Sequence, residues 1–130
     1  MPDLTIGQTF TGTKRFSQAE FDQFARLSGD DNPIHVDPAF AGRTDFGRTV
    51  AHGMHLYSMI CGLLGRTFPG AVQLSQQFMF PAPTFAGEDM TITLSVLETR
   101  PAAAQVRLST TITNPAGTVT CTGETVLAWR

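Results

Sequence analysis

The sequence has little charge, and almost none of its positive charge comes from lysine. Asp, Glu, Lys and Arg make up only 15% of the 130 residues, and Lys14 is the single lysine. The nine basic residues are scattered along the chain, and the formal net charge is -2. Nucleic-acid-binding domains need a basic patch or stripe, so no nucleic acid is expected as a partner. With 42% hydrophobic residues, the chain instead favours a sizeable interior and a subunit interface.

Cysteines and long apolar runs are also scarce. Cys61 and Cys121 are the two cysteines, and both lie in apolar sequence, so we expect reduced, buried side chains and no disulfide framework. The longest apolar stretch, residues 54–64, is too short to cross a bilayer. The first residues have neither a basic start nor an apolar run, which argues against a signal peptide. We therefore expect no membrane association and a cytoplasmic location.

The helical patterns predict one α+β domain over residues 1–130. Ser17 and Glu20 form a capping box ahead of apolar residues at helical spacing, and Gly29 suits the end of that helix. A second helix is predicted over residues 51–68, which are apolar almost all round. Such a helix is typically buried on every side.

The strand patterns lie on both sides of these helices. Five segments have strand character: residues 8–16, 72–80, 91–99, 105–113 and 118–129. In the last of them the apolar alternation slips between Cys121 and Val126, which predicts a β-bulge near Gly123. Because the all-apolar helix must be covered, a long curved antiparallel sheet wrapped around it is the expected architecture.

GDDNPIHVD, at the end of the first predicted helix, concentrates polar residues in one stretch. Pro33 prevents a continuous helix, so the segment must turn, and Asp30 and His35 can converge across the turn. A carboxylate and an imidazole that face one small volume can hold a water molecule and move its protons. The composition is also that of an ordinary turn, so both interpretations stay open here. Asn32 is expected in a supporting role as a turn former, and Asp37 as a helix cap.

A second candidate lies at the start of the predicted apolar helix, in VAHGMH. Gly53 would leave its backbone N–H without a partner at the positive end of the helix dipole, where it can stabilise negative charge on a substrate oxygen. Gly53 is equally suited to close packing of the helix against the sheet. His35, His52 and His55 have no cysteine pair beside them, so no metal site is expected.

Together, GDDNPIHVDPAFA and AHGMHLYSMICGLL resemble the signature of the MaoC-like (R)-specific enoyl-CoA hydratases. The resemblance continues towards both ends of the chain. It implies the hot-dog fold and a homodimer or a dimer of dimers. The implied reaction is reversible syn addition of water to a trans-2-enoyl-CoA, which gives an (R)-3-hydroxyacyl-CoA. The implied partners are an acyl-CoA thioester and water, with no cofactor and no metal.

The resemblance also assigns roles to individual residues. The catalytic pair falls on Asp30 and His35, and the motif asparagine falls on Asn32. The oxyanion-hole glycine falls on Gly53, through its backbone N–H. The sequence leaves open which member of the pair is the base. Three further residues are candidates for lining the acyl pocket: Cys61, Met59 and Phe78.

Three other functions stay open on the same fold. An acyl-CoA thioesterase has the fold but does not usually carry both motifs, and the fold alone does not decide between the two activities. A 3-hydroxyacyl-acyl-carrier-protein dehydratase would use the same chemistry on another carrier. The third alternative is a non-catalytic acyl-thioester-binding subunit that kept the motif. The complete set of Asp30, His35 and Gly53 argues against this last one.

Overall fold

The computed structural model describes residues 1–130, with element bounds close to the predicted ones. The strands are β1 (Thr9–Arg15), β2 (Val72–Met79), β3 (Asp89–Arg100), β4 (Gln105–Thr113) and β5 (Val119–Ala128). The helices are α1 (Gln18–Ser28), α2 (Pro33–Val36), α3 (Pro38–Ala41) and α4 (Gly53–Thr67), with a 3₁₀ turn, η1, at Pro101–Ala103. All strand pairs are antiparallel in the order β1-β3-β4-β5-β2, so β1 and β2 form the two edges.

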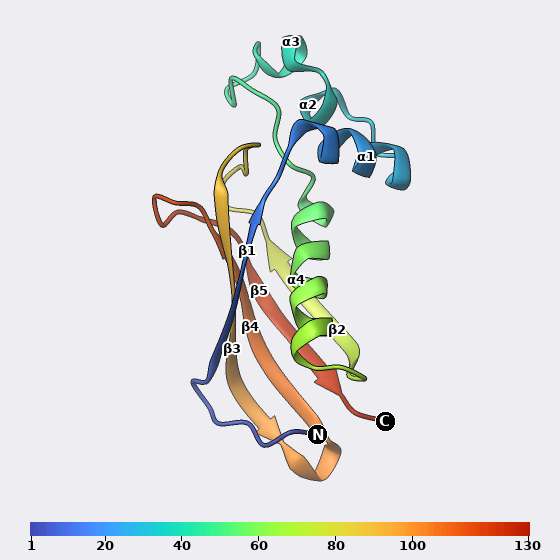
Figure 1. Cartoon of the computed structure of the whole chain (residues 1–130), viewed down its shortest axis with the longest axis vertical. Coiled ribbons are helices and arrows are strands. Elements are labelled where there is room, and N and C mark those ends of the chain that lie inside the picture. Colours follow the sequence, from blue (N-terminus) through green and yellow to red (C-terminus); the bar gives the residue numbers. More distant parts are fainter.

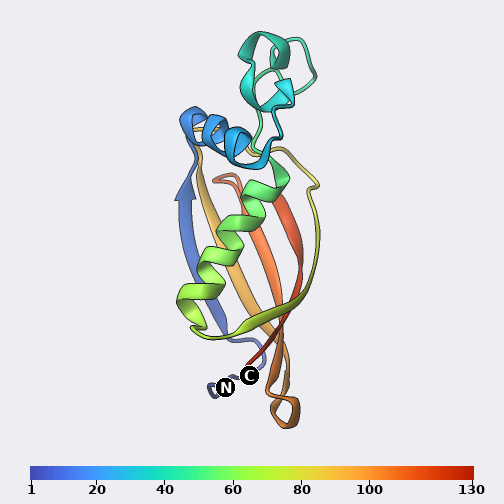
Figure 2. The same cartoon turned by 90° about the vertical axis from the view of Figure 1, so that its right-hand side faces the viewer.

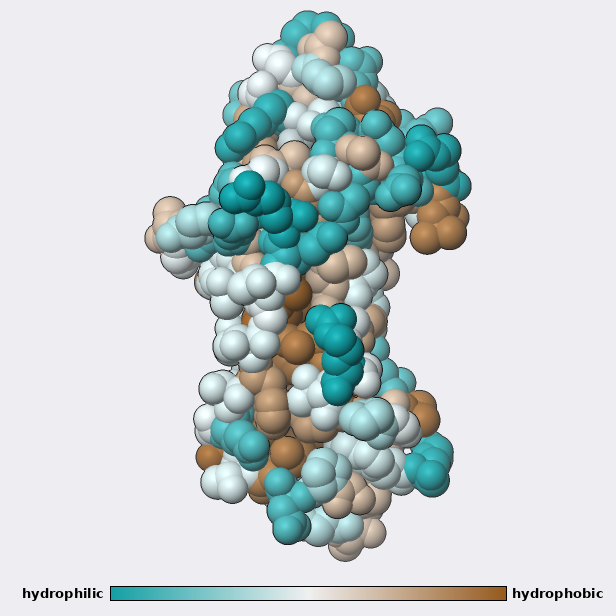
Figure 3. Space-filling view, in the orientation of Figure 1, coloured by the Kyte–Doolittle hydropathy of each residue, from teal (hydrophilic) through white to brown (hydrophobic).

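The sheet curves around α4, which lies along its concave face (Figure 2). The three shorter helices α1, α2 and α3 gather at one end of the sheet, next to the start of α4 (Figure 1). In the same orientation, hydrophilic residues cover much of this helical end, while hydrophobic residues show on the surface in the middle of the molecule below it (Figure 3). The predicted α+β architecture, a curved antiparallel sheet around an apolar helix, is confirmed. No helix is both long enough and apolar enough to span a membrane.

The hydrophobic core lies between α4 and the central strands. Each fully buried aliphatic side chain there contributes about 1.5–3 kcal/mol relative to an exposed one. The members from α4, β3 and β4 are Leu56, Ile60, Leu63, Leu64, Met90, Ile92, Leu94, Val96, Val106, Leu108 and Ile112.

Helix α1 begins and ends where the sequence predicts. Ser17 Oγ accepts a hydrogen bond from the Glu20 N–H at 3.2 Å and so caps the first turn. Gly29 ends the helix in the left-handed region with φ of 80°, and its N–H donates to the Ala25 carbonyl oxygen. The chain therefore leaves α1 in a fixed direction immediately before Asp30.

The prediction that α4 is buried on every side is wrong. Leu56 and Ile60 are buried against the sheet. On the other side, Met54 is 51% exposed, and Tyr57 and Met59 are half-buried. One curved sheet covers one side of the helix only. The open side is also apolar, so periodicity does not separate it from the buried side.

The β-bulge predicted near Gly123 is also wrong. Gly123 pairs in regular register with Phe78 on β2 and with Thr110 on β4. Thr125 is fully buried, with its hydroxyl hydrogen-bonded, so the inward alternation of β5 continues through a polar residue and does not slip. Glycine is needed at 123 because a Cβ there would overlap the Gln77 carbonyl group. The register shifts lie elsewhere: between Gln73 and Ser75, Val96 and Glu98, and Ile112 and Thr113.

Candidate active site

The segment between α1 and α2 folds into two consecutive capping turns. The Asn32 N–H donates to Asp30 Oδ1 at 3.3 Å. Asn32 Oδ1 in turn accepts the Ile34 N–H at 3.2 Å and caps α2. The sequence predicts the turn but not the single helical turn that follows it. Pro33 starts that turn because the first position of a helix needs no N–H donor, and His35 lies within it.

The fold brings Asp30 and His35 together. His35 Nε2 lies 3.9 Å from Asp30 Oδ2. On the other side of the ring, His35 Nδ1 lies 2.7 Å from the Val50 carbonyl oxygen. A carbonyl oxygen only accepts, so Nδ1 carries the proton and Nε2 presents a lone pair on the side of Asp30. The separation of 3.9 Å is longer than a direct hydrogen bond, so both atoms are free to accept hydrogen bonds from one molecule between them.

The two side chains differ in environment. The His35 side chain is 10% exposed, whereas the Asp30 side chain is 52% exposed. Burial lowers the pKa of His35 below its ordinary value of 6.5, and the neighbouring His52 acts in the same direction. The hydrogen bond to Val50 and the charge of Asp30 oppose this shift of the pKa. The imidazole is therefore neutral at neutral pH and able to accept a proton at Nε2.

From the sequence, His52 was considered only as a metal ligand, and its contacts with the segment that carries Asp30 and His35 were missed. His52 Nε2 donates to the backbone carbonyl of Asp30 at 2.8 Å, and its ring stacks on His35 with centroids 3.8 Å apart. The residue is 2% exposed, so these contacts hold the catalytic segment from behind. Gln18 of α1 was also missed, and its Nε2 donates to the His35 carbonyl oxygen at 2.9 Å. The only sequence signal for His52 is its place next to Gly53.

Ligand atoms of Asp30, His35 and His52 lie within 4.8 Å of one another, which is close enough to hold a metal ion. The two imidazole rings, however, are stacked within 24° of parallel. Their in-plane lone pairs run side by side and do not converge on one ion, as tetrahedral zinc requires. The arrangement gives no reason to change the prediction of a metal-free site.

Helix α4 begins at Gly53, beside His35. The carbonyl of His52 accepts the N–H groups of His55 and Leu56, whereas the Gly53 N–H makes no backbone hydrogen bond. His35 and Gly53 line the same cavity of about 260 Å³. A free N–H at the positive end of a helix dipole can stabilise negative charge that develops on an oxygen in this cavity.

The three predicted pocket-lining residues do not lie in one place. Phe78 and Cys61 face the groove between α4 and β2, through contacts with Tyr57 and Gln73 respectively. Met59 instead borders a hollow between α4 and α1. Both cysteines are unpaired. The prediction of burial is correct for the other one, Cys121, but wrong for Cys61, which is half-buried.

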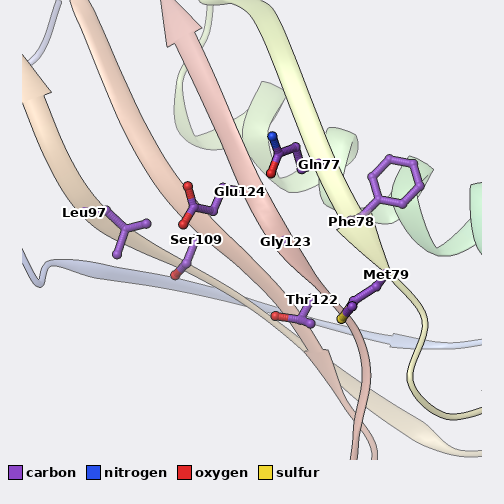
Figure 4. A pocket seen from close by; sticks show the side chains of 8 residues that line it. All are labelled: Gln77, Phe78, Met79, Leu97, Ser109, Thr122, Gly123 and Glu124. Atoms are coloured by element: carbon purple, nitrogen blue, oxygen red, sulfur yellow. The ribbon is translucent and has the colours of Figure 1, made fainter.

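A larger hollow of about 450 Å³ lies on the other face of the sheet (Figure 4). Gln77, Ser109 and Glu124 line it from three neighbouring strands, and α4 lies behind the sheet in this view. None of the candidate catalytic residues borders this hollow. It is therefore separate from the site at the start of α4.

A long antiparallel sheet curved around one helix defines a hot-dog protein, and here an imidazole–carboxylate pair lies at the start of that helix. A family model described as MaoC like domain matches residues 3–116. The chain therefore belongs to the MaoC-like family.

Named relatives cover almost the whole chain. It is 41% identical to the (R)-specific enoyl-CoA hydratase of Aeromonas caviae, over 95% of this chain and 94% of that protein. It is 38% identical to the 3-hydroxybutyryl-CoA dehydratase of Methylorubrum extorquens, over 84% of this chain and 71% of that protein. The solved structure of an (R)-hydratase from A. caviae involved in PHA biosynthesis superimposes with a TM-score of 0.94 at 39% identity, covering 100% of both chains.

Proposed function

We propose that the protein is an (R)-specific enoyl-CoA hydratase, a hydro-lyase that adds water reversibly and syn to trans-2-enoyl-CoA. The observation that carries the proposal is the neutral His35, whose Nε2 lies 3.9 Å from the Asp30 carboxylate and which lines one cavity together with Gly53 and its free N–H. The similarity to an (R)-specific enoyl-CoA hydratase and to a 3-hydroxybutyryl-CoA dehydratase supports the same reaction in its two directions.

The thioester carbonyl binds with its oxygen at the Gly53 N–H. When oxygen adds to C3 of the enoyl group, the electrons of the double bond move towards this carbonyl, which becomes enolate-like. The N–H and the positive end of α4 stabilise that charge more strongly than they stabilise the neutral ground state. One donor of this kind typically contributes about 10²–10³ in kcat.

One water molecule binds between Asp30 Oδ2 and His35 Nε2. One water oxygen can lie about 2.8 Å from both atoms when these are 3.9 Å apart, so its two O–H groups can donate to Asp30 Oδ2 and His35 Nε2. His35 Nε2 takes one proton from the water as the water oxygen bonds to C3, while Asp30 accepts a hydrogen bond from the O–H that the oxygen keeps and stabilises the imidazolium. The imidazolium then gives its proton to C2 on the same face. Hydrogen and hydroxyl are thereby added syn, and no cofactor takes part.

The proposal is tested with purified protein and crotonyl-CoA. The expected result is loss of the enoyl absorbance without release of free thiol, with (R)-3-hydroxybutyryl-CoA as the product. A thioesterase would release CoA while the enoyl group persists. A dehydratase restricted to acyl carrier protein would leave crotonyl-CoA unchanged and act on the carrier-bound acyl group. A non-catalytic binding subunit would change neither substrate.

We also infer that the protein forms a homodimer through β2 and the open side of α4, with a dimer of dimers as a further step. β2 is an edge strand, and its residues Val72, Leu74 and Met79 are 44%, 41% and 62% exposed. Met54 adds exposed apolar surface from α4. An apolar edge strand is a template for pairing with another chain, and a second copy would cover both surfaces. The cytoplasmic location stays a prediction.

Sedimentation analysis is expected to give about twice the chain mass of 14.1 kDa. Leu74→Lys is expected to shift the protein towards the monomer, because a charged edge residue opposes strand pairing. Ile6→Lys is the control, since Ile6 is also an exposed apolar residue and lies beyond the strands, next to β1. A monomeric wild type, or an undisturbed dimer in Leu74→Lys, would contradict the inferred interface.

A further inference from the structure

A groove runs along α4 from Gly53 towards the end of the helix. Strand β2 and Phe80, the residue after β2, form its other wall. Gly53, Tyr57 and Cys61 are four residues apart, so they lie on one face of the helix. Opposite Gly53 is Phe80, whose ring would lie 2.6 Å from a Cβ at that position. Opposite Tyr57 is Phe78, and the two rings stack with centroids 5.0 Å apart. A chain that starts at the Gly53 N–H and follows the groove therefore meets Tyr57 first.

Two cavities lie along α4, one on each side of Tyr57. The first is the cavity of about 260 Å³ that His35 and Gly53 line. The second has about 120 Å³ and is lined from α4 by Cys61 and Leu64, near the far end of the helix. Tyr57 borders neither cavity, and its place on the helix lies between them. The tyrosine thus divides the groove into a reactive part and a closed-off end.

Hydrogen bonds hold the Tyr57 side chain across the groove. The Tyr57 hydroxyl donates to Gln73 Oε1 at 2.8 Å. Gln73 Nε2 in turn donates to Thr125 Oγ1 at 2.8 Å and to Gln76 Oε1 at 3.1 Å, so the sheet fixes the amide. Burial raises the pKa of Tyr57 to about 12, which keeps the hydroxyl protonated as a donor. The ring is therefore anchored at both its stacked face and its hydroxyl end.

We propose that Tyr57 closes the acyl channel at about the sixth carbon of the acyl chain, counting the thioester carbonyl as the first, so that the enzyme takes short-chain trans-2-enoyl thioesters. The proposal rests on the hydratase function, because that function places the carbonyl at Gly53. A helix rises 1.5 Å per residue, so Tyr57 lies about 6 Å beyond Gly53 along α4. An extended carbon chain advances about 1.2 Å per bond, as the extended backbone does, which allows about five bonds before the ring.

The experiment compares kcat/KM for crotonyl-, hexenoyl-, octenoyl- and decenoyl-CoA. In the wild type, kcat/KM is expected to fall at least about tenfold from hexenoyl- to octenoyl-CoA, because a channel that ends in a fixed ring excludes the longer chain. Tyr57→Ala removes the ring and is expected to raise the octenoyl-to-crotonyl ratio of kcat/KM at least about tenfold. Tyr57→Phe keeps the ring and should keep the short-chain preference. Met59→Ala removes a bulky side chain from the side of α4 that faces α1, and this variant should also keep the short-chain preference.

Two results would overturn the proposal: a wild type that hydrates octenoyl-CoA as efficiently as crotonyl-CoA, or a Tyr57→Ala variant with the wild-type ratio. Circular dichroism and thermal unfolding show whether each variant is folded. If the alanine variant does not fold, Tyr57→Leu is used in its place, because leucine removes the ring but leaves a shorter apolar side chain. Absence of any crotonyl-CoA hydration by the wild type would contradict the hydratase function itself, which separates the two failures.

Discussion

Replacing His35 with alanine is expected to lower kcat for crotonyl-CoA hydration at least about a hundredfold. The variant lacks Nε2, which lies 3.9 Å from Asp30 Oδ2 and accepts the proton of water in the proposed mechanism. Asp30→Asn is expected to lose a similar factor, because a neutral amide accepts a hydrogen bond from the water less strongly than a carboxylate does and does not stabilise the imidazolium. Steady-state kinetics measure both losses, and circular dichroism checks that the fold persists.

Asp31→Asn is the matched control for Asp30→Asn. It removes the same charge one residue further along, from an exposed side chain that forms no ion pair with His35. It should therefore keep wild-type turnover. Full activity in folded His35→Ala and Asp30→Asn variants would contradict the assignment of the pair, whatever reaction the protein catalyses.

The pH dependence of the wild type gives a second measurement of the role of His35. Burial lowers the pKa of His35 below 6.5, so Nε2 is unprotonated at neutral pH, and activity is lost as the pH falls through that lowered value. Stability changes in the same direction, because the unfolded chain binds this proton at a higher pH than the folded chain. An acid limb of kcat/KM centred above 6.5 would contradict a buried neutral base.

Gly53→Pro is expected to lower kcat by about 10²–10³, because it removes the backbone N–H that the proposed mechanism places at the thioester oxygen. Gly53 is the first residue of α4, where the fixed φ and the missing N–H of proline are tolerated. His52 has extended backbone with ψ of 138°, which is the conformation that a residue before proline adopts. The substitution therefore deletes one donor with little demand on the backbone.

Gly53→Ala separates the effect of the N–H from the effect of added bulk. Its Cβ meets the same Phe80 ring at 2.6 Å, but the N–H is kept. Phe80 is 41% exposed, so its ring has room to turn aside in both variants. The alanine variant should lose far less activity than the proline variant. Equal losses in the two folded proteins would show that displacement of Phe80 causes the defect and would contradict the oxyanion role.

The sequence predicts local elements well where each residue acts on its own neighbours. Ser17 and Gly29 place both ends of α1, because capping depends on a few adjacent groups. The burial of α4 and the alternation of β5 were predicted wrongly for a different reason. Met54 is apolar but exposed, and Thr125 is polar but fully buried through hydrogen bonds to residues far away in sequence. The burial of each side chain depends on which residues pack against it in the fold, and the spacing of apolar residues in the sequence does not carry that information.

The candidate active site also combines features that the sequence predicts with features that it does not. The approach of Asp30 to His35 follows from the turn chemistry of Asn32 and Pro33, so it could be predicted. The tautomer of His35 is set by a carbonyl fifteen residues later, and the support from His52 depends on how the start of α4 packs against the turn. These contacts arise only from the tertiary fold.

The stereochemistry of crotonyl-CoA hydration in D₂O tests the account most directly. One acid–base pair on one face of the double bond delivers both the hydroxyl and the new hydrogen. The account predicts an (R) hydroxyl at C3, with deuterium added to C2 on the same face and no release of free thiol. Anti addition, a racemic alcohol, or thiol release with the double bond intact would contradict it.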